Sequence, residues 1–208
     1  MGIAFAPLLL NSTCAYLLGW QNRFTSLSIA GLVLHECLAL AVFAYVLSQQ
    51  KRRLQHVGFT FRFADVGLGV LLAIGGALAA AFCELALYIV RSVRVDEALQ
   101  SADAPTVFGP DVVVAGIVLI AVNPIFEELL VRGYLMRELA ELTRSSWTPI
   151  VASVVLQSSY HLYQGISNVL FLACCFTVWA LYFQRTRKLM PIVFAHFYLD
   201  ALALFRST

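Results

Sequence analysis

The stretch Asn123-Pro-Ile-Phe-Glu-Glu-Leu-Leu-Val-Arg132 places two carboxylates and a guanidinium inside an apolar run that begins at Val112. Inserting a carboxylate at the centre of a bilayer helix costs on the order of 2.5–3.5 kcal/mol of free energy, so two adjacent carboxylates indicate a functional role. On a helix Glu128 and Arg132 lie four residues apart and face each other, so the arginine is expected to neutralise Glu128. Glu127 points about 100° away and lacks that partner. It is therefore our leading candidate for the reacting group, because an unpaired carboxylate in a low dielectric is suited to accepting a proton.

The composition is that of an integral membrane protein. Of the 208 residues, 61% are hydrophobic and only 12% are charged, and the mean hydropathy is +0.82. Soluble domains carry roughly 25% charged residues. The formal net charge of +2 is too small to indicate a nucleic-acid partner. We therefore expect a single integral membrane domain over residues 1–208, in contact with the lipid bilayer.

Repeated apolar runs predict an all-α polytopic membrane bundle of about seven transmembrane helices. In lipid every backbone N–H and C=O must be paired internally, which favours helices. The predicted spans are 3–20, 27–49, 65–91, 110–137, 147–163, 166–184 and 189–206. Pro110, Pro149 and Pro191 stand at span starts, where a missing N–H is harmless. Pro124 lies inside the fourth span and is expected to kink it one turn before Glu127.

Small residues are expected to serve packing. The third span contains Gly67, Gly69, Gly75, Gly76 and the alanines 77–81, which offer small surfaces for close helix contact. Five cysteines fall within apolar runs without C-x-x-C spacing and are interpreted as buried small hydrophobes. They are Cys14, Cys37, Cys83, Cys174 and Cys175.

The distribution of lysine and arginine predicts the orientation in the membrane. Three alternate loops are basic, whereas the 92–109 loop carries Asp96, Glu97 and Asp103 against Arg94. The basic residues are Lys51, Arg52, Arg53 and Arg62, then Arg137 and Arg144, then Arg185, Arg187 and Lys188. By the positive-inside rule these loops are cytoplasmic. With seven spans the N-terminus is then cytoplasmic and the C-terminus lies on the far side.

Other ionisable residues at membrane depth need an explanation. His161 ends the fifth span, and His196 and Asp200 stand four apart in the seventh, so the carboxylate can accept a hydrogen bond from the imidazole and fix its tautomer. Each alone has an ordinary interpretation, as an interfacial histidine or a buried polar tie between helices. Together with the carboxylate pair they favour one converging site.

Three further charged groups at membrane depth are His35, Glu36 and Glu84. One interpretation is functional: they form a proton path or a second site. The other is structural: they face the bundle interior and tie helices together. We favour the ties.

The ionisable residues form three motifs in order on separate spans: Glu127-Glu128-x-x-x-Arg132, then His161, then His196-x-x-x-Asp200. This pattern resembles the CAAX prenyl endopeptidase and bacteriocin-processing family of intramembrane proteases. The resemblance covers residues 110–206 as a protease core, and residues 1–109 match only as generic spans. It implies that Glu127 and His161 activate water. It also implies that His196 and Asp200 stabilise the developing oxyanion.

Two positions depart from the family pattern. The second motif commonly has an aromatic residue four positions before its histidine, where this chain has Gln157, although Tyr160 is adjacent to the histidine. Asp200 stands where the prenyl-protein proteases have asparagine. Because an ionised aspartate repels an oxyanion, Asp200 must either be protonated or act by orienting His196. The second departure puts a prenylated substrate in question.

Our hypothesis is hydrolysis of a peptide bond within the membrane, near the C-terminus or a membrane segment of a membrane-associated protein or peptide. Glu127 acts as general base on water, His161 shares the proton, and His196 polarises the scissile carbonyl. Counting about 1.5 Å per residue from the prolines that start their spans places His161 roughly 10 Å from the level of His196, unless the fifth helix begins below the membrane surface. The compact chain favours a prokaryotic member, in the plasma membrane.

Two alternatives use the same residues. His161, His196 and Glu127 also suit Zn²⁺ with an open position, which would make the protein a metalloprotease with zinc as cofactor. The sequence lacks a local H-E-x-x-H, which weakens the zinc hypothesis. The other alternative is a transporter or immunity-type membrane protein that uses these groups as a proton relay. Purified protein incubated with peptides separates the two classes, because a transporter leaves the peptides intact.

Overall fold

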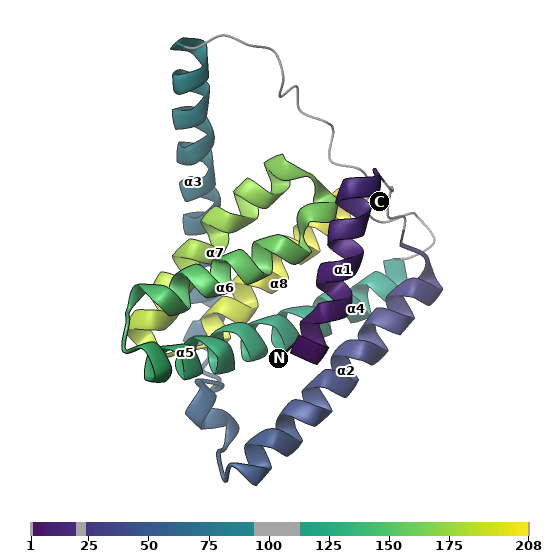
Figure 1. The fold of residues 1–208 in the computed structure, drawn as a ribbon, viewed down its shortest axis with the longest axis vertical. Coiled ribbons are helices and arrows are strands. Elements are labelled where there is room, and N and C mark those ends of the chain that lie inside the picture. Colours follow the sequence, from purple (N-terminus) through teal and green to yellow (C-terminus); the bar gives the residue numbers. More distant parts are fainter. Residues whose placement is uncertain (1, 20–23, 94–112, 208) are drawn as a thin grey trace.

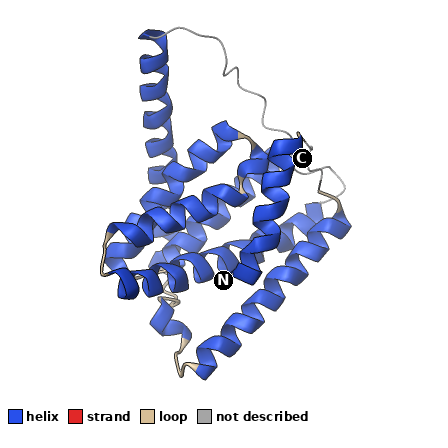
Figure 2. Cartoon of the chain, viewed as in Figure 1, coloured by secondary structure: helices blue, strands red, loops and turns tan. Residues whose placement is uncertain are grey.

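The computed structural model describes residues 2–19, 24–93 and 113–207, and helices carry that part of the chain (Figures 1 and 2). The α-helices are α1 (Gly2–Leu18), α2 (Ser26–Gln49), α3 (Ala64–Val93), α4 (Val113–Glu128), α5 (Met136–Thr143), α6 (Trp147–Tyr160), α7 (Ile166–Thr186) and α8 (Met190–Ser207). Two 3₁₀ turns, η1 (Leu54–Val57) and η4 (Leu162–Gln164), and a π-helix, η3 (Leu129–Leu135), complete the order. The predicted all-α bundle is confirmed.

The predicted spans correspond to the observed helices with small shifts at their ends. Four helical segments of the described chain are long and apolar enough to cross a membrane: Ser26–Gln49, Ala64–Ile89, Val113–Thr143 and Ile166–Thr186. Two further apolar helices, Ala4–Leu18 and Met190–Phe205, are shorter. Because α4, η3 and α5 form one continuous helical segment, the described residues contain seven helical segments, in agreement with the count of about seven, whereas fewer of them reach full crossing length. These segments support an integral membrane protein.

The fourth span is longer than predicted and changes its winding in the middle. Helical structure runs through residues 113–143, and residues 110–112, with Pro110, lie outside the described part. Pro124 lies inside α4 as predicted. After Glu128 the chain winds as a π-helix, in which the N–H of Met136 bonds to the carbonyl of Val131 five residues earlier. The sequence did not predict this π-helix, and such segments are frequent at functional sites.

Helix α3 packs closely against α7 and α8 through small residues. A Cβ added to Gly69 would lie 2.5 Å from the Cβ of Phe194, and one added to Gly76 would lie 3.0 Å from the Sγ of Cys175. Gly67 faces open space. The expected packing surfaces are thus confirmed at the glycines that meet α7 and α8. The indole N–H of Trp179 adds a hydrogen bond of 3.2 Å to the carbonyl of Leu72.

The five cysteines are free thiols, and the expectation that all are buried is wrong. Cys175 is buried and Cys174 half-buried, but Cys14, Cys37 and Cys83 are exposed on the outer faces of α1, α2 and α3. An apolar thiol that faces lipid satisfies the same hydropathy pattern as one that faces the core. Hydropathy alone therefore does not distinguish the two positions.

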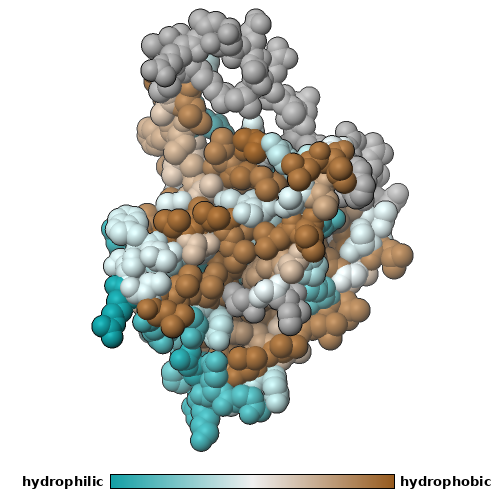
Figure 3. Space-filling model, in the orientation of Figure 1, coloured by the Kyte–Doolittle hydropathy of each residue, from teal (hydrophilic) through white to brown (hydrophobic). Residues whose placement is uncertain are grey.

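The three basic loops lie at one end of the bundle. Arg52, after α2, forms an ion pair with Glu138 of α5. The N–H of Leu189, before α8, donates a 3.0 Å hydrogen bond to the carbonyl of Gly58, which adopts a left-handed φ of +84°. Figure 3 shows hydrophilic side chains gathered where α2 ends and α5 lies. The common side of these loops agrees with the prediction, and their assignment to the cytoplasm stays a prediction.

The close contact of α3 with α8 gives a test of the packing. We expect Gly69→Ala to lower the free energy of unfolding by about 1–3 kcal/mol, because its Cβ overlaps Phe194 and the helices must separate. The matched control is Gly67→Ala, which meets nothing within 4 Å and improves helix propensity. Thermal unfolding in detergent measures both variants. Equal stability of the two would contradict the packing described here.

Candidate active site

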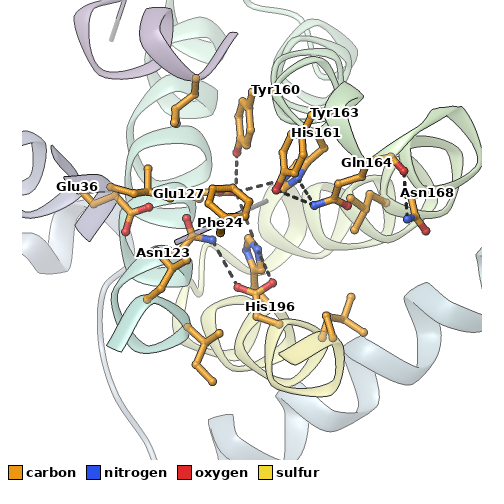
Figure 4. Close-up of a pocket in the computed structure, with 18 of the residues that line it drawn as sticks. Phe24, Glu36, Asn123, Glu127, Tyr160, His161, Tyr163, Gln164, Asn168 and His196 are labelled. Atoms are coloured by element: carbon orange, nitrogen blue, oxygen red, sulfur yellow. Dashed lines mark hydrogen bonds and ion pairs between the residues drawn. The ribbon is translucent and has the colours of Figure 1, made fainter. Parts of the chain in front are cut away.

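The bundle brings together one carboxylate and two imidazoles from three different helical segments. Glu127 ends α4, His161 follows α6, and His196 lies on α8. The Oε2 of Glu127 is 3.9 Å from the Nε2 of His161 and 3.9 Å from the Nε2 of His196. All three side chains are buried. Figure 4 shows them around one cavity.

Arg132 neutralises Glu128, as predicted, inside the bundle. Its Nη1 lies 2.8 Å from the Oε2 of Glu128, and both side chains are fully buried. The guanidinium also lies over two aromatic rings, 5.3 Å from the centroid of Phe176 and 5.9 Å from that of Trp179. A desolvated cation over an aromatic face gains about 2 kcal/mol. The buried charge is therefore compensated from three sides.

His196 is held by Glu128 rather than by Asp200. Its Nδ1 is 2.8 Å from the Oε1 of Glu128, whereas its Nε2 is 3.7 Å from the Oδ1 of Asp200, beyond hydrogen-bond distance. The expected tautomer-fixing bond between His196 and Asp200 is thus wrong for this structure. The reason is geometric: Glu128, at the end of α4, lies at the Nδ1 edge of the ring, whereas Asp200 lies on the Nε2 side. Asp200 instead lies 3.4 Å from the Nδ2 of Asn123.

Sequence reasoning missed two donors to Glu127. The hydroxyl of Tyr160 donates to its Oε2 at 2.5 Å, and the amide of Gln157 donates to the same oxygen at 3.3 Å. Gln157 also reaches the Oε1 of Glu128, at 3.4 Å. Gln157 occupies the position that was noted as a departure from the family pattern. Its spacing of four before His161 places both on one helix face, and that signal could have identified it.

Glu36 and Asn123 also join the site. Glu36, on α2, is fully buried and lines the cavity beside Asn123 and Glu127 (Figure 4). In the orientation that satisfies its neighbours, the Asn123 nitrogen turns away from Asp200 and donates to the Oε1 of Glu36 at 2.9 Å and to the Oε1 of Glu127 at 3.1 Å. The preferred interpretation of Glu36 as a helix tie therefore misses that it faces this cavity. Asn123 stands four residues before Glu127, a spacing that the sequence displays.

The two other ionisable groups at membrane depth, His35 and Glu84, differ in their position relative to this cavity. A ring nitrogen of His35 is 2.9 Å from the carbonyl oxygen of Ala4, so His35 ties α2 to α1 as expected. Glu84 is exposed on α3, and the expectation that it faces the bundle interior is wrong. His35 also lines the cavity that contains Glu127, whereas Glu84 does not.

A cavity of about 760 Å³ joins these groups. Its polar floor carries Glu127, His161 and His196, and its walls are largely apolar, with Phe24, Leu32, Phe171, Leu172 and Leu199. The volume falls within the range of pockets that enclose small ligands or short peptide segments. Polar groups concentrated at one point of an apolar cavity suit chemistry on one bond of a bound chain.

The zinc alternative depends on three side chains that converge on one ion. In residues 2–19, 24–93 and 113–207 no group of three His, Cys, Asp or Glu side chains is arranged to hold a metal ion. Glu127 is instead held by protein donors at both of its oxygens. The residues present do not fit a zinc site in this arrangement, and no step below uses a metal.

The comparisons with known proteins point to one family. Residues 109–202 match the family model described as "Type II CAAX prenyl endopeptidase Rce1-like". The match contains all three motifs and leaves α1, α2 and α3 outside it. Comparison with curated proteins and with solved structures gives no match. Residues 109–202 therefore belong to the family of Rce1-like CAAX prenyl endopeptidases, which are peptide hydrolases.

Proposed function

We propose that this chain hydrolyses a peptide bond within the membrane, with Glu127 as the general base. The observation that supports this role is the position of its Oε2, 3.9 Å from the Nε2 of both His161 and His196. These separations are too long for direct hydrogen bonds, but one water oxygen can contact the carboxylate and an imidazole at the same time. A water held there would lie beside a base and a proton acceptor.

The reaction then proceeds in two proton transfers. Glu127 takes a proton from water as the oxygen attacks the scissile carbonyl carbon, and His161 shares that proton. The proton passes to the amide nitrogen as the C–N bond breaks, which leaves a new carboxyl group and a free amine. Tyr160 and Gln157 keep the Oε2 of Glu127 in place throughout.

His196 stabilises the oxyanion of the tetrahedral intermediate. Its Nδ1 contacts Glu128, which supports the doubly protonated ring that donates from Nε2. Arg132 holds Glu128 in position and neutralises it. Asp200, on the cavity wall, lies 3.7 Å from the Nε2 of His196 and acts on the position of that ring rather than by contacting the oxyanion. The substrate is a membrane-associated protein or peptide.

Replacing the proposed base tests the mechanism directly. We expect Glu127→Gln to lower the cleavage rate by about 10²- to 10⁴-fold, because the amide cannot take a proton from water. The matched control is Glu84→Gln, which removes an exposed carboxylate at membrane depth outside the cavity. Mass spectrometry of membrane-protein C-termini, in cells that express each variant, measures cleavage. Unchanged cleavage by Glu127→Gln at equal expression would end this assignment.

Glu36 is expected to act as a positioning residue through Asn123. Glu36→Ala removes the acceptor that holds the Asn123 amide, so Glu127 loses its orientation and kcat falls by up to about 10²-fold with little change in KM. Glu36→Gln keeps an acceptor oxygen and is expected to restore most of the rate. Steady-state kinetics of the purified variants measures this difference. An equal loss in both variants would mean that the charge, not the hydrogen bond, matters.

Metal removal separates the glutamate mechanism from the zinc alternative. We expect activity to be unchanged after exhaustive dialysis against a chelator, because Glu127 activates water without a Lewis acid. The measurement is the cleavage rate of the purified protein before and after dialysis, with metal content determined on the same samples. Activity that disappears and returns with Zn²⁺ would support the metalloprotease instead.

A further inference from the structure

The cavity extends from the catalytic groups toward only one end of the bundle. On α4 its lining residues are Glu127 and residues that precede it: Leu119, Ile120 and Asn123. On α8 they are His196 and residues that follow it: Leu199, Asp200, Leu202 and Ala203. Because α4 and α8 run in opposite directions, the residues before Glu127 and the residues after His196 lie on the same side of the catalytic groups. The cavity therefore opens where α4 begins and α8 ends.

The other helices agree with this direction. The cavity is lined by the first half of α2, including Ser28 and Leu32, and by the first half of α7, including Asn168. Four exposed lining residues lie at this end, on α1, α2 and α8: Asn11, Ser28, Leu202 and Ala203. A fifth exposed lining residue, Pro7, lies in the first half of α1. At the closed end stand Trp179 and Phe176, both fully buried over Arg132. A substrate therefore enters the cavity from the end of the bundle where Asn11 and Ser28 lie.

The three basic loops lie at the opposite end. They join the end of α2 to the start of α3, the end of α5 to the start of α6, and the end of α7 to the start of α8. The Arg52 to Glu138 ion pair and the hydrogen bond from Leu189 to Gly58 connect these loops. Nine of the 14 lysines and arginines lie in these loops or in the helices beside them: Lys51, Arg52, Arg53, Arg62, Arg137, Arg144, Arg185, Arg187 and Lys188. Such an excess marks the cytoplasmic side of a membrane protein.

We propose that the catalytic cavity opens on the non-cytoplasmic side of the membrane, and that its substrate is a polypeptide segment displayed on that side. This proposal rests on the proposed peptide hydrolysis and adds the side from which the substrate enters. A peptide exposed only to the cytoplasm would have to pass the buried side chains of Phe176, Trp179 and Arg132 to reach Glu127.

The lining of the cavity indicates the chemistry of that segment. Near the opening, Asn11, Ser28, Gln164 and Asn168 offer neutral donors and acceptors for peptide groups, between apolar walls. None of the described residues that line the cavity is lysine or arginine, so no permanent cation stands near the opening to bind a terminal carboxylate or a phosphate. The lining fits an uncharged, partly apolar stretch of extended chain.

Labelling from each side of the membrane tests the orientation. Ser28→Cys and Asn168→Cys report on the opening, and Gln55→Cys, exposed in the loop after α2, is the matched control. The parent chain with its native cysteines supplies the background. A charged, membrane-impermeant maleimide is added to sealed right-side-out and inverted vesicles. We expect the opening variants to be labelled in right-side-out vesicles and to lose labelling in inverted ones, with the reverse for Gln55→Cys.

The outcomes separate this proposal from the proposed function. The proposed side of entry is overturned if both opening variants are labelled only in inverted vesicles. It is also overturned if both are labelled in both vesicle types or in neither. Two variants are used so that the test still holds if one of them fails to fold. A second assay uses a charged, water-soluble peptide that the detergent-solubilised protein cleaves and Glu127→Gln does not. Cleavage in right-side-out vesicles supports the proposal, and cleavage only in inverted vesicles overturns it. If solubilised protein cleaves no peptide, the proposed hydrolysis fails while the labelling still decides the orientation.

Discussion

The ion pair between Arg132 and Glu128 is the interaction on which the rest of the site depends. Both side chains are fully buried, and charges in such a place are tolerated only when they are paired and hydrogen-bonded. Removing one partner of a buried pair typically costs about 3–5 kcal/mol, because the other charge remains uncompensated. Arg132 also lies over Phe176 and 3.4 Å from its carbonyl oxygen, so the pair joins η3 to α7.

The ion pair between Arg132 and Glu128 also contacts the helices that carry the other groups of the site. Glu128 accepts from Nδ1 of His196 on α8 and contacts Gln157 on α6, so one carboxylate fixes the relative positions of several helices. This explains how an imidazole and a neighbouring carboxylate stay in register without a metal or a disulfide among the described residues. Hydrogen bonds are stronger in a low dielectric, so these contacts hold the helices firmly, although the Nε of Arg132 and the Oε1 of Gln157 have no hydrogen-bond partner within the described part of the chain. Rigidity here serves the proposed chemistry, because the reacting groups must already be aligned.

The sequence predicted most of the fold and the central groups of the candidate site. Apolar runs of crossing length are a strong signal, since lipid leaves the backbone no other arrangement. Glu127, Glu128, Arg132, His161 and His196 were identifiable because charges at membrane depth are rare. Asp200 was identified as well, but its contact with His196 was not, because the sequence shows that two residues share a helix face and not which neighbour a ring prefers.

Features that depend on relative depth or winding were not predictable. The count from the span starts placed His161 roughly 10 Å from the level of His196, yet both imidazoles lie 3.9 Å from one carboxylate oxygen. The start of α6 at Trp147 was predicted, but the tilt of the helix and its depth relative to α8 decide the level of His161, and neither has a sequence signature. Glu36 was named without its role, since nothing in the order of residues relates α2 to α4. The π-helix has no periodic pattern of its own.

Two adjacent glutamates acquire different roles here because their surroundings differ, not because their chemistry does. Glu128 meets a guanidinium and an imidazole, so its charge is committed to holding other groups. Glu127 meets a phenol and amides and faces the cavity, so it is oriented without being neutralised by a permanent cation. A base must be held in place and remain free to take a proton, and neutral donors meet both requirements. The four-residue spacing of Glu128 and Arg132 brings the guanidinium to Glu128, and this leaves Glu127 available for the reaction.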